Sequence, residues 1–191
     1  MKHRRADWPD RLAGVAAEDL VFVDESGANT TMTRTHGYAP KGERLTASIP
    51  HGHYKTITFV AALTMAGMTA PFAMDRAMNG PWFLAWVEQA LLPLLRPGMV
   101  IVMDNLPAHK VAGVREAIAG AGCRVEYLPP YSPDLNPIEN AFSKFKARLR
   151  QEGRRTVDGV YEAMRLAVDD ISAQDCRGYF RHCGHRPATP P

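Results

Sequence analysis

Two aspartates stand directly after short apolar segments of the sequence. Asp24 follows Leu-Val-Phe-Val, and Asp104 follows Val-Ile-Val-Met. Continuous apolar runs of this length are typical of buried strands. A carboxylate at the end of such a strand is costly to bury unless it is paired, hydrogen-bonded or bound to a metal ion. A single aspartate often caps a turn, but two strands with the same ending favour a shared site.

A shared site built from two carboxylates needs a cation. Like charges held close together raise each other's pKa unless a positive charge neutralises them. Hard oxygen ligands select Mg²⁺ or Mn²⁺, which commonly act beside substrate phosphates. Zinc is not expected at this site, because the necessary spacing of His and Cys ligands is missing. The two aspartates therefore predict a site for Mg²⁺ or Mn²⁺.

The segment PPYSPDLNPIEN at 129–140 offers a third acid, either Asp134 or Glu139. Glu139 also has a purely structural interpretation. It stands three residues after Asn136, with Pro137 at the first helical position, which is the pattern of a helix capping box. A carboxylate folded back on a helix cap is less free to bind metal. The spacing alone does not distinguish Asp134 from Glu139.

The elements that must position these acids follow from the hydrophobic pattern. The polar segment 31–50, with two glycines and two prolines, is expected to be a loop-rich hairpin. The order of the predicted elements, with strands first and then strands alternating with helices, predicts an α/β fold with a mixed sheet and helices packed on it. Open sheets of this kind place their sites at the carboxyl ends of strands. Strands are expected over 20–24, 56–67, 68–75, 99–104 and 124–128, and helices over 79–94 and 111–120, from Pro137, and after Thr156.

Charge is distributed unevenly along the 191 residues, whose net charge is +3. Residues 141–155 carry +5 and residues 31–55 carry +3, so the remainder is acidic. Basic segments around an acidic remainder could hold a polyanion near a carboxylate site, although solvated surface charge is the commoner cause of such runs. The candidate DNA-contacting residues are Lys144, Lys146, Arg148 and Arg150, and, as a weaker set, Arg34, Lys41 and Arg44.

Cysteine content and hydropathy bear on the compartment. Three cysteines give no disulfide framework and suit a reducing compartment. No apolar stretch follows the basic N-terminal residues, so no signal peptide is expected. The uncharged run 56–74 is 19 residues long, but its threonines, Gly67 and Pro71 favour two strands joined by a turn over a membrane helix. We therefore expect a cytoplasmic protein without a membrane segment.

Three blocks together resemble the catalytic core of a DDE transposase, in particular the bacterial insertion-sequence branch of the mariner superfamily. They are FVDESG at 22–27, MDNLPAHK at 103–110 and YLPPYSPDLNPIEN at 127–140. Between Asp104 and Glu139 lie 34 residues, the separation of the second and third acids in that branch, so the resemblance selects Glu139. HGHYKTITFVAAL and MNGPWFLAWVEQ also resemble this branch, and the match runs from about residue 18 to residue 180.

The resemblance implies a ribonuclease H-like fold with a mixed five-stranded sheet flanked by helices, in which the strands bearing Asp24 and Asp104 lie side by side. It implies two Mg²⁺ ions, with Mn²⁺ as a substitute, held by Asp24, Asp104 and Glu139. These ions would support DNA strand cleavage and strand transfer at transposon ends and a TA target. The protein would act as a homodimer on duplex DNA and associate with the nucleoid.

The resemblance also predicts the organisation of the chain: 1–17 as an N-terminal linker, 18–180 as the catalytic domain and 181–191 as a disordered tail. Family members usually carry an N-terminal helix-turn-helix module, and about 19 residues before the first catalytic strand are too few for one. The chain is therefore expected to need a separate helix-turn-helix polypeptide encoded upstream, or to be a truncated remnant. A non-catalytic DNA-binding regulator and a ribonuclease H-like repair or resolving nuclease are the alternatives.

Several other residues have two interpretations. Asn105 and His109, within one turn of Asp104, either support the site by orienting a ligand or touching a phosphate, or shape the turn and cap the next helix. Aromatic residues at helical spacing in 82–86 favour core packing over base stacking. A zinc site in the C-terminal cluster is disfavoured, because a paired CxxC knuckle is missing. That cluster consists of Cys176, His182, Cys183 and His185.

Overall fold

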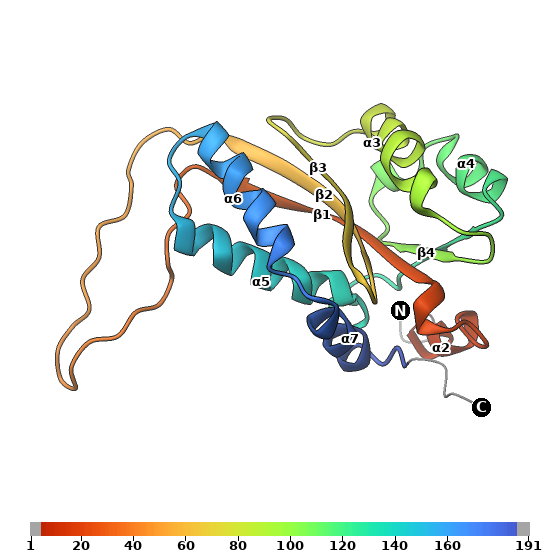
Figure 1. Ribbon diagram of the computed structural model, residues 1–191, viewed down its shortest axis with the longest axis horizontal. Coiled ribbons are helices and arrows are strands. Elements are labelled where there is room, and N and C mark those ends of the chain that lie inside the picture. Colours follow the sequence, from red (N-terminus) through yellow and green to blue (C-terminus); the bar gives the residue numbers. More distant parts are fainter. Residues whose placement is uncertain (1–4, 187–191) are drawn as a thin grey trace.

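The computed structural model of the chain describes residues 5–186 and contains a mixed five-stranded sheet with strand order β3-β2-β1-β4-β5 (Figure 1). The strands β1, β2 and β3 are antiparallel neighbours, and β4 and β5 run parallel to β1. The predicted five-stranded mixed sheet is therefore confirmed. The strands are β1 (Leu20–Asn29), β2 (Thr56–Thr64), β3 (Gly67–Met74), β4 (Val100–Met103) and β5 (Arg124–Tyr127).

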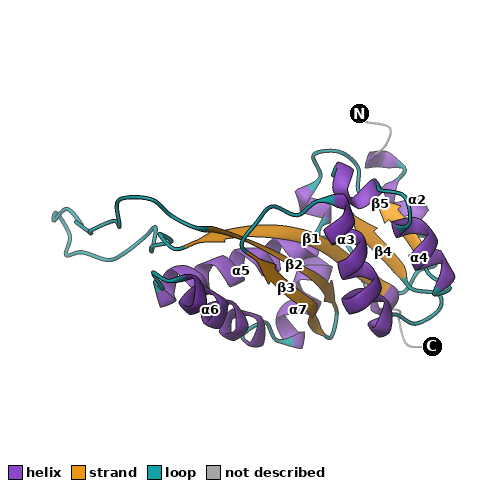
Figure 2. Ribbon diagram, turned by 90° about the horizontal axis from the view of Figure 1, so that it is seen from above, coloured by secondary structure: helices purple, strands orange, loops and turns teal. Residues whose placement is uncertain are grey.

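Helices cover both faces of the sheet (Figure 2). α5, α6 and α7 enclose one hydrophobic core against the sheet, and α3 and α4 enclose a second core on the opposite face. A π-helical turn and a 3-10 turn prolong α3 to Leu94. The helices are α2 (Trp8–Arg11), α3 (Gly80–Trp86), α4 (Val114–Gly120), α5 (Pro137–Glu152), α6 (Val157–Asp169) and α7 (Ala173–His182).

Alternation along β1 separates the two cores. Phe22 packs in the core beneath α5 and α7, whereas Val21 and Val23 pack in the core beneath α3. Because successive side chains of a strand point to opposite faces, Asp24 lies on the α5 face and Glu25 on the α3 face. The two neighbouring acids of β1 therefore enter different environments.

The expectation that Asp24 ends its strand is wrong. β1 continues to Asn29, and its second half pairs with β2 alone, because β4 has only four residues. The last parallel pair between β1 and β4 joins Val23 and Met103. Asp24 and Asp104 therefore stand one residue beyond that pair, where β4 leaves the sheet. The prediction that the strands before these two aspartates lie side by side is confirmed.

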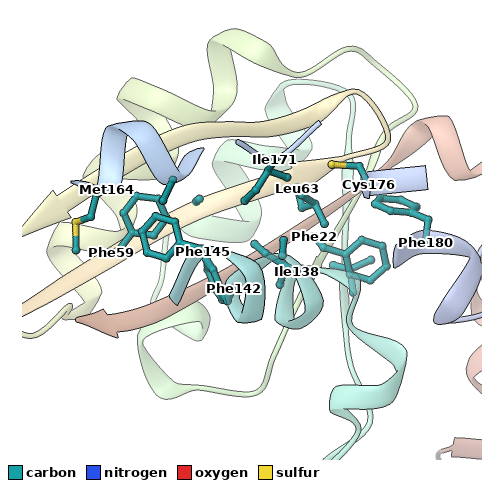
Figure 3. Packing of buried hydrophobic residues seen from close by; sticks show 14 of the residues in the cluster. Phe22, Phe59, Leu63, Ile138, Phe142, Phe145, Met164, Ile171, Cys176 and Phe180 are labelled. Carbon is teal, nitrogen blue, oxygen red and sulfur yellow. The ribbon is translucent and has the colours of Figure 1, made fainter. Parts of the chain in front are cut away.

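Aromatic packing fixes α5 against the sheet (Figure 3). Phe145 of α5 stacks on Phe59 of β2 with ring centroids 4.4 Å apart, and Phe142 meets the same ring at 6.1 Å. All three rings are buried. This packing determines where the first turn of α5, with Glu139, lies relative to β1.

The segment between β1 and β2 is an extended loop that projects from the body of the protein (Figure 1). The expected hairpin in 31–50 is wrong in one respect: among the described residues, no strand forms there. Its sequence lacks an alternating apolar pattern that could pair across a turn. Residues 56–74 instead form β2, β3 and the turn between them, as predicted. Among the helices of 5–186, none combines the length and the hydropathy that spanning a bilayer requires.

Both ends of the described chain contribute buried side chains. Trp8 of α2, in the predicted linker, is buried. Within the predicted tail, α7 runs to His182. The buried His185 ring lies 4.9 Å from the ring of Phe22, and its Nε2 is 3.1 Å from the carbonyl oxygen of Leu135. Residues 187–191 of that predicted tail lie outside the described residues.

We expect Ser172→Ala to destabilise the fold by about 1 kcal/mol. The Ser172 hydroxyl accepts the Asp175 N–H, and the Asp175 carboxylate accepts the Ser172 N–H, a capping box that begins α7. Urea unfolding measures the change. Ser143→Ala, at an exposed position inside α5, is the matched control and should not destabilise, since alanine favours helix interiors. Equal unfolding midpoints for both variants would contradict this role of the cap.

Candidate active site

Residues from three separated segments line one pocket of about 460 Å³. Asp24 comes from the middle of β1, Asp104 from the residue after β4, and Glu139 from the first turn of α5. The segment Leu128–Pro133 forms another wall. The structure therefore brings together the three acids that the resemblance selected.

Asp24 is the most enclosed of the three acids, with 8% of its surface exposed. Its Oδ1 accepts the Glu25 N–H at 2.8 Å, and its Oδ2 accepts the Asn136 side-chain amide at 3.0 Å. Burial is the main reason that the pKa of Asp24 is raised to about 7; the Glu25 N–H lowers this pKa, and the nearby carboxylates of Asp104 and Glu139 raise it. A cation in the pocket would favour the ionised form of Asp24.

Asp104 is more open to solvent and better neutralised. Its Oδ1 accepts the Leu106 N–H at 2.9 Å and lies 2.8 Å from Nδ1 of His109. Partial burial acts to raise the pKa of Asp104, but the His109 ring and the Leu106 N–H outweigh it and hold that pKa below its usual value. The carboxylate of Asp104 is therefore ionised at neutral pH.

Glu139 projects into the pocket rather than onto its own helix cap. Asn136 precedes α5, and no side-chain hydrogen bond caps this helix within the described chain. The capping-box interpretation of Glu139 is therefore wrong. Asp134, the other candidate, does not line the pocket but forms a two-point ion pair with Arg5.

The residues of the pocket suit a hard divalent cation. Within 5–186, no three Asp, Glu, His or Cys side chains are close enough to enclose a metal ion by themselves. Mg²⁺, however, is commonly held by one or two carboxylates together with substrate phosphates. Oδ1 of Asn136 is buried beside Asp24 and has no hydrogen-bond partner in the described chain. The carboxylates and this amide oxygen are the kind of donors that Mg²⁺ and Mn²⁺ prefer.

The two predicted supporting residues take different positions. The ring of His109 is fully buried between Asp104 and Glu25, with Nε2 3.2 Å from Oε1 of Glu25. Burial acts to lower the pKa of His109, but the two carboxylates raise it to about 9. Asn105 instead donates to the carbonyl oxygen of Leu128 and so ties the segment after β4 to the end of β5.

Sequence reasoning missed two residues of this site. Asn136 was interpreted only as a helix cap, yet its side chain donates to Asp24. Glu25 follows Asp24 directly, but nothing in the sequence indicates its partner His109, which is 84 residues away. In both cases the partner lies on another element, so no local pattern could reveal it.

The predicted DNA-contacting cations divide into two groups. Lys144 pairs with Asp175 at 2.7 Å, and Arg148 pairs with Glu152 and Asp170, so these two cations hold α5 to its neighbours. The remaining predicted cations form no ion pair with another described residue. They are Lys146 and Arg150 on α5 and Arg34, Lys41 and Arg44 in the projecting loop.

For the other residues with both a functional and a structural interpretation, the structure favours the structural role. Phe83 and Trp86 are buried in the core beneath α3, as core packing predicts, while Trp82 is partly exposed. Cys176 and Cys183 are buried free thiols in the described chain. Burial raises the pKa of each thiol to about 11, so neither is a ready zinc ligand.

The sheet order, the helices on both faces and the acids on neighbouring strands define a ribonuclease H-like fold. The chain belongs to the DDE superfamily endonucleases, whose family model matches residues 19–159. The predicted relation to DDE enzymes and the predicted ribonuclease H-like fold are thus confirmed. A comparison with curated proteins gives no match.

Among solved structures, the chain is similar to Mos1 transposase in a paired-end complex with the left transposon end, at 16% identity and a TM-score of 0.73. The match covers 96% of this chain and 56% of that one, so the chain spans a little over half the length of that protein. It is also similar to the Mos1 transposase catalytic domain with Raltegravir and Mg, at 14% identity and a TM-score of 0.66, covering 96% and 88% of the two chains. These likenesses concern the fold.

Proposed function

We propose that this chain is the catalytic domain of a transposase from the bacterial insertion-sequence branch of the mariner superfamily, and that it cuts and rejoins DNA strands. One observation carries the proposal: Asp24, Asp104 and Glu139 come from three separate segments and line the same pocket. The family match over 19–159 supports it. The proposed domain extends from about residue 18 to at least residue 180.

In this proposal the three acids hold two divalent ions, Mg²⁺ or Mn²⁺. Such ions make a nucleophilic oxygen more reactive and stabilise the leaving 3′ oxygen during in-line displacement at phosphorus. The protein's own part is to present carboxylate oxygens from fixed positions. Asn136 holds Asp24 by donating to its Oδ2, and the Leu106 N–H holds Asp104.

The proposed substrate is duplex DNA, cut at transposon ends and joined at a TA target. Mos1 transposase has been solved in a paired-end complex with a transposon end and in further complexes with Mg and Mn. In this chain, Lys146 and Arg150 on α5 and the cations of the projecting loop are the side chains proposed to contact phosphates. We further propose a homodimer on DNA, assisted by a separate helix-turn-helix polypeptide and located at the nucleoid.

The proposal is tested by nicking of supercoiled plasmid. We expect nicked circles with Mg²⁺ or Mn²⁺, none in EDTA, and recovery when Mg²⁺ is restored. Asp104→Asn, purified in parallel, controls for contaminating nucleases. Equal nicking by both proteins would point to contamination and contradict the proposal. DNA binding that weakens with salt, without any nicking, would favour a non-catalytic regulator instead.

A further inference from the structure

We propose that Glu25 is a positioning residue for Asp104, which it holds through the buried ring of His109. The inference rests on the proposed function, because the placement of Asp104 matters only if the pocket binds a cation. It adds to that function a brace that crosses from β1 to the segment after β4. The brace consists of three residues, Glu25, His109 and Asp104.

The brace is built from close contacts on a buried ring. His109 has 0% of its surface exposed, and its two ring nitrogens lie 3.2 Å from Oε1 of Glu25 and 2.8 Å from Oδ1 of Asp104. The second contact is a close ion pair rather than a well-directed hydrogen bond. Phe83 packs on the ring with centroids 4.3 Å apart, and Tyr127 donates its hydroxyl to the His109 carbonyl oxygen at 3.1 Å. The ring therefore has little freedom to turn.

The need for a brace follows from the sheet. Hydrogen bonding between β1 and β4 ends at Val23 and Met103, so no sheet pairing holds Asp104 to its neighbour Asp24. The chain after Asp104 enters a 3-10 helix, Pro107–Lys110, which carries His109. Glu25 is anchored in β1, which continues to Asn29. The contact between Glu25 and His109 thus ties this segment back to the strand that bears Asp24.

The brace also orients the Asp104 carboxylate. Both contacts of this carboxylate, from the Leu106 N–H and from His109, go to Oδ1. Because one oxygen is held from two directions, rotation of the carboxylate is restricted, and Oδ2 keeps no hydrogen bond or ion pair with another described residue. Groups that orient a metal-binding side chain in this way commonly change metal affinity or activity by about 10–100-fold when removed.

Three variants test the proposal by Mn²⁺ affinity, measured by isothermal titration calorimetry. We expect Glu25→Ala to weaken Mn²⁺ binding by about 10–100-fold, and Glu25→Gln, which keeps an acceptor of the same size, to weaken it less. Glu126→Gln is the matched control, because the Glu126 side chain is 14% exposed against 13% for Glu25. Glu126 pairs with Arg11 of α2 and Arg124 of β5 instead of with the His109 ring. The control variant should bind Mn²⁺ as the wild type does.

A second readout separates positioning from simple destabilisation. The Mg²⁺ concentration for half-maximal nicking should rise in the Glu25 variants, while the KM for DNA stays within about twofold. If Glu25→Ala does not fold, Glu25→Gln still decides the matter. Wild-type Mn²⁺ affinity in folded Glu25→Ala would overturn the brace, and so would wild-type affinity in Glu25→Gln where Glu25→Ala does not fold.

Failure of the brace and failure of the proposed function give different results. If Asp104→Asn loses Mn²⁺ binding while both Glu25 variants keep it, the carboxylate site stands and the brace is wrong. If Asp104→Asn binds Mn²⁺ as well as the wild type, the proposed function is wrong, and the brace is overturned with it. Loss in Asp104→Asn and graded loss in the Glu25 variants would support both.

Discussion

The Asp24→Asn variant, kept free of metal, is expected to be more stable than the wild-type protein at pH 8, by about 2–4 kcal/mol in the free energy of unfolding. The same variant should lose DNA nicking. Asp24 is buried beside the carboxylates of Asp104 and Glu139, so its charge is costly without a cation. Removing the charge relieves that cost and also removes an oxygen ligand that the proposed reaction needs.

The pH dependence of this gain follows from the pKa of Asp24. The folded protein holds the Asp24 proton up to a pKa of about 7, whereas an unfolded chain loses it near about pH 4. Between these values the folded state binds more protons, so this group lowers wild-type stability as the pH rises from about 4 to about 7. The advantage of the variant should therefore be absent below about pH 4, grow across this window and stay constant above it.

The amide in Asp24→Asn can keep the local hydrogen bonds. Its carbonyl oxygen can accept the Glu25 N–H, as Oδ1 of Asp24 does. The buried Oδ1 of Asn136 has no partner among the described residues, so rotation of the Asn136 amide would let it accept from the substituted side chain. The substitution therefore removes a charge without demanding a new cavity or a new polar partner.

Urea unfolding in EDTA at pH 4, 6 and 8 measures this effect. Asp75→Asn, at a side chain that is 67% exposed, is the control and should change the free energy of unfolding by less than about 0.5 kcal/mol at any pH. Added Mg²⁺ should narrow the gap, because binding stabilises the wild-type fold. A variant no more stable than the wild type at pH 8 would show that Asp24 carries its charge without cost.

The parts of the fold that the sequence could predict are those encoded locally. The apolar runs before Asp24 and Asp104 identify β1 and β4, because burial on both faces requires continuous hydrophobic residues. Pro137 likewise marks the start of α5, because proline is favoured at the first position of a helix. The choice of Glu139 over Asp134, however, rests on the resemblance to DDE transposases, because spacing alone does not distinguish these two acids.

The remaining features depend on partners distant in sequence. The end of β1 was misplaced because β2 extends the strand beyond Asp24, a pairing that no run of residues encodes. The sequence groups Lys144 and Arg148 with Lys146 and Arg150 as candidate DNA contacts, but Asp175 of α7 and Asp170, in the turn between α6 and α7, neutralise the first two. Helical spacing predicts on which face of a helix a residue lies, but only the folded chain shows which elements pack against that face.

Glu139→Gln is expected to lower the rate of metal-dependent nicking by at least about 10³-fold, which corresponds to ~4 kcal/mol of transition-state free energy. Glu139 is exposed in the first turn of α5 and makes no cap hydrogen bond, so glutamine of the same size changes only the charge and the ligand chemistry. A neutral amide oxygen is a weaker ligand for Mg²⁺ than a carboxylate. Stability should fall by no more than about 1 kcal/mol, the usual worth of an acid at a helix N-terminus.

Asp134→Asn is the control that decides which acid of the 129–140 segment serves the reaction. The Asp134 side chain is 59% exposed, lies outside the pocket and pairs with Arg5, so its loss should change the nicking rate by less than about threefold. Nicking of supercoiled plasmid under saturating Mg²⁺ measures both variants. If Asp134→Asn lost as much activity as Glu139→Gln, the assignment of the third acid would fail. Loss confined to Glu139→Gln would instead tie the reaction to the one acid of this segment that faces Asp24 and Asp104 across the pocket.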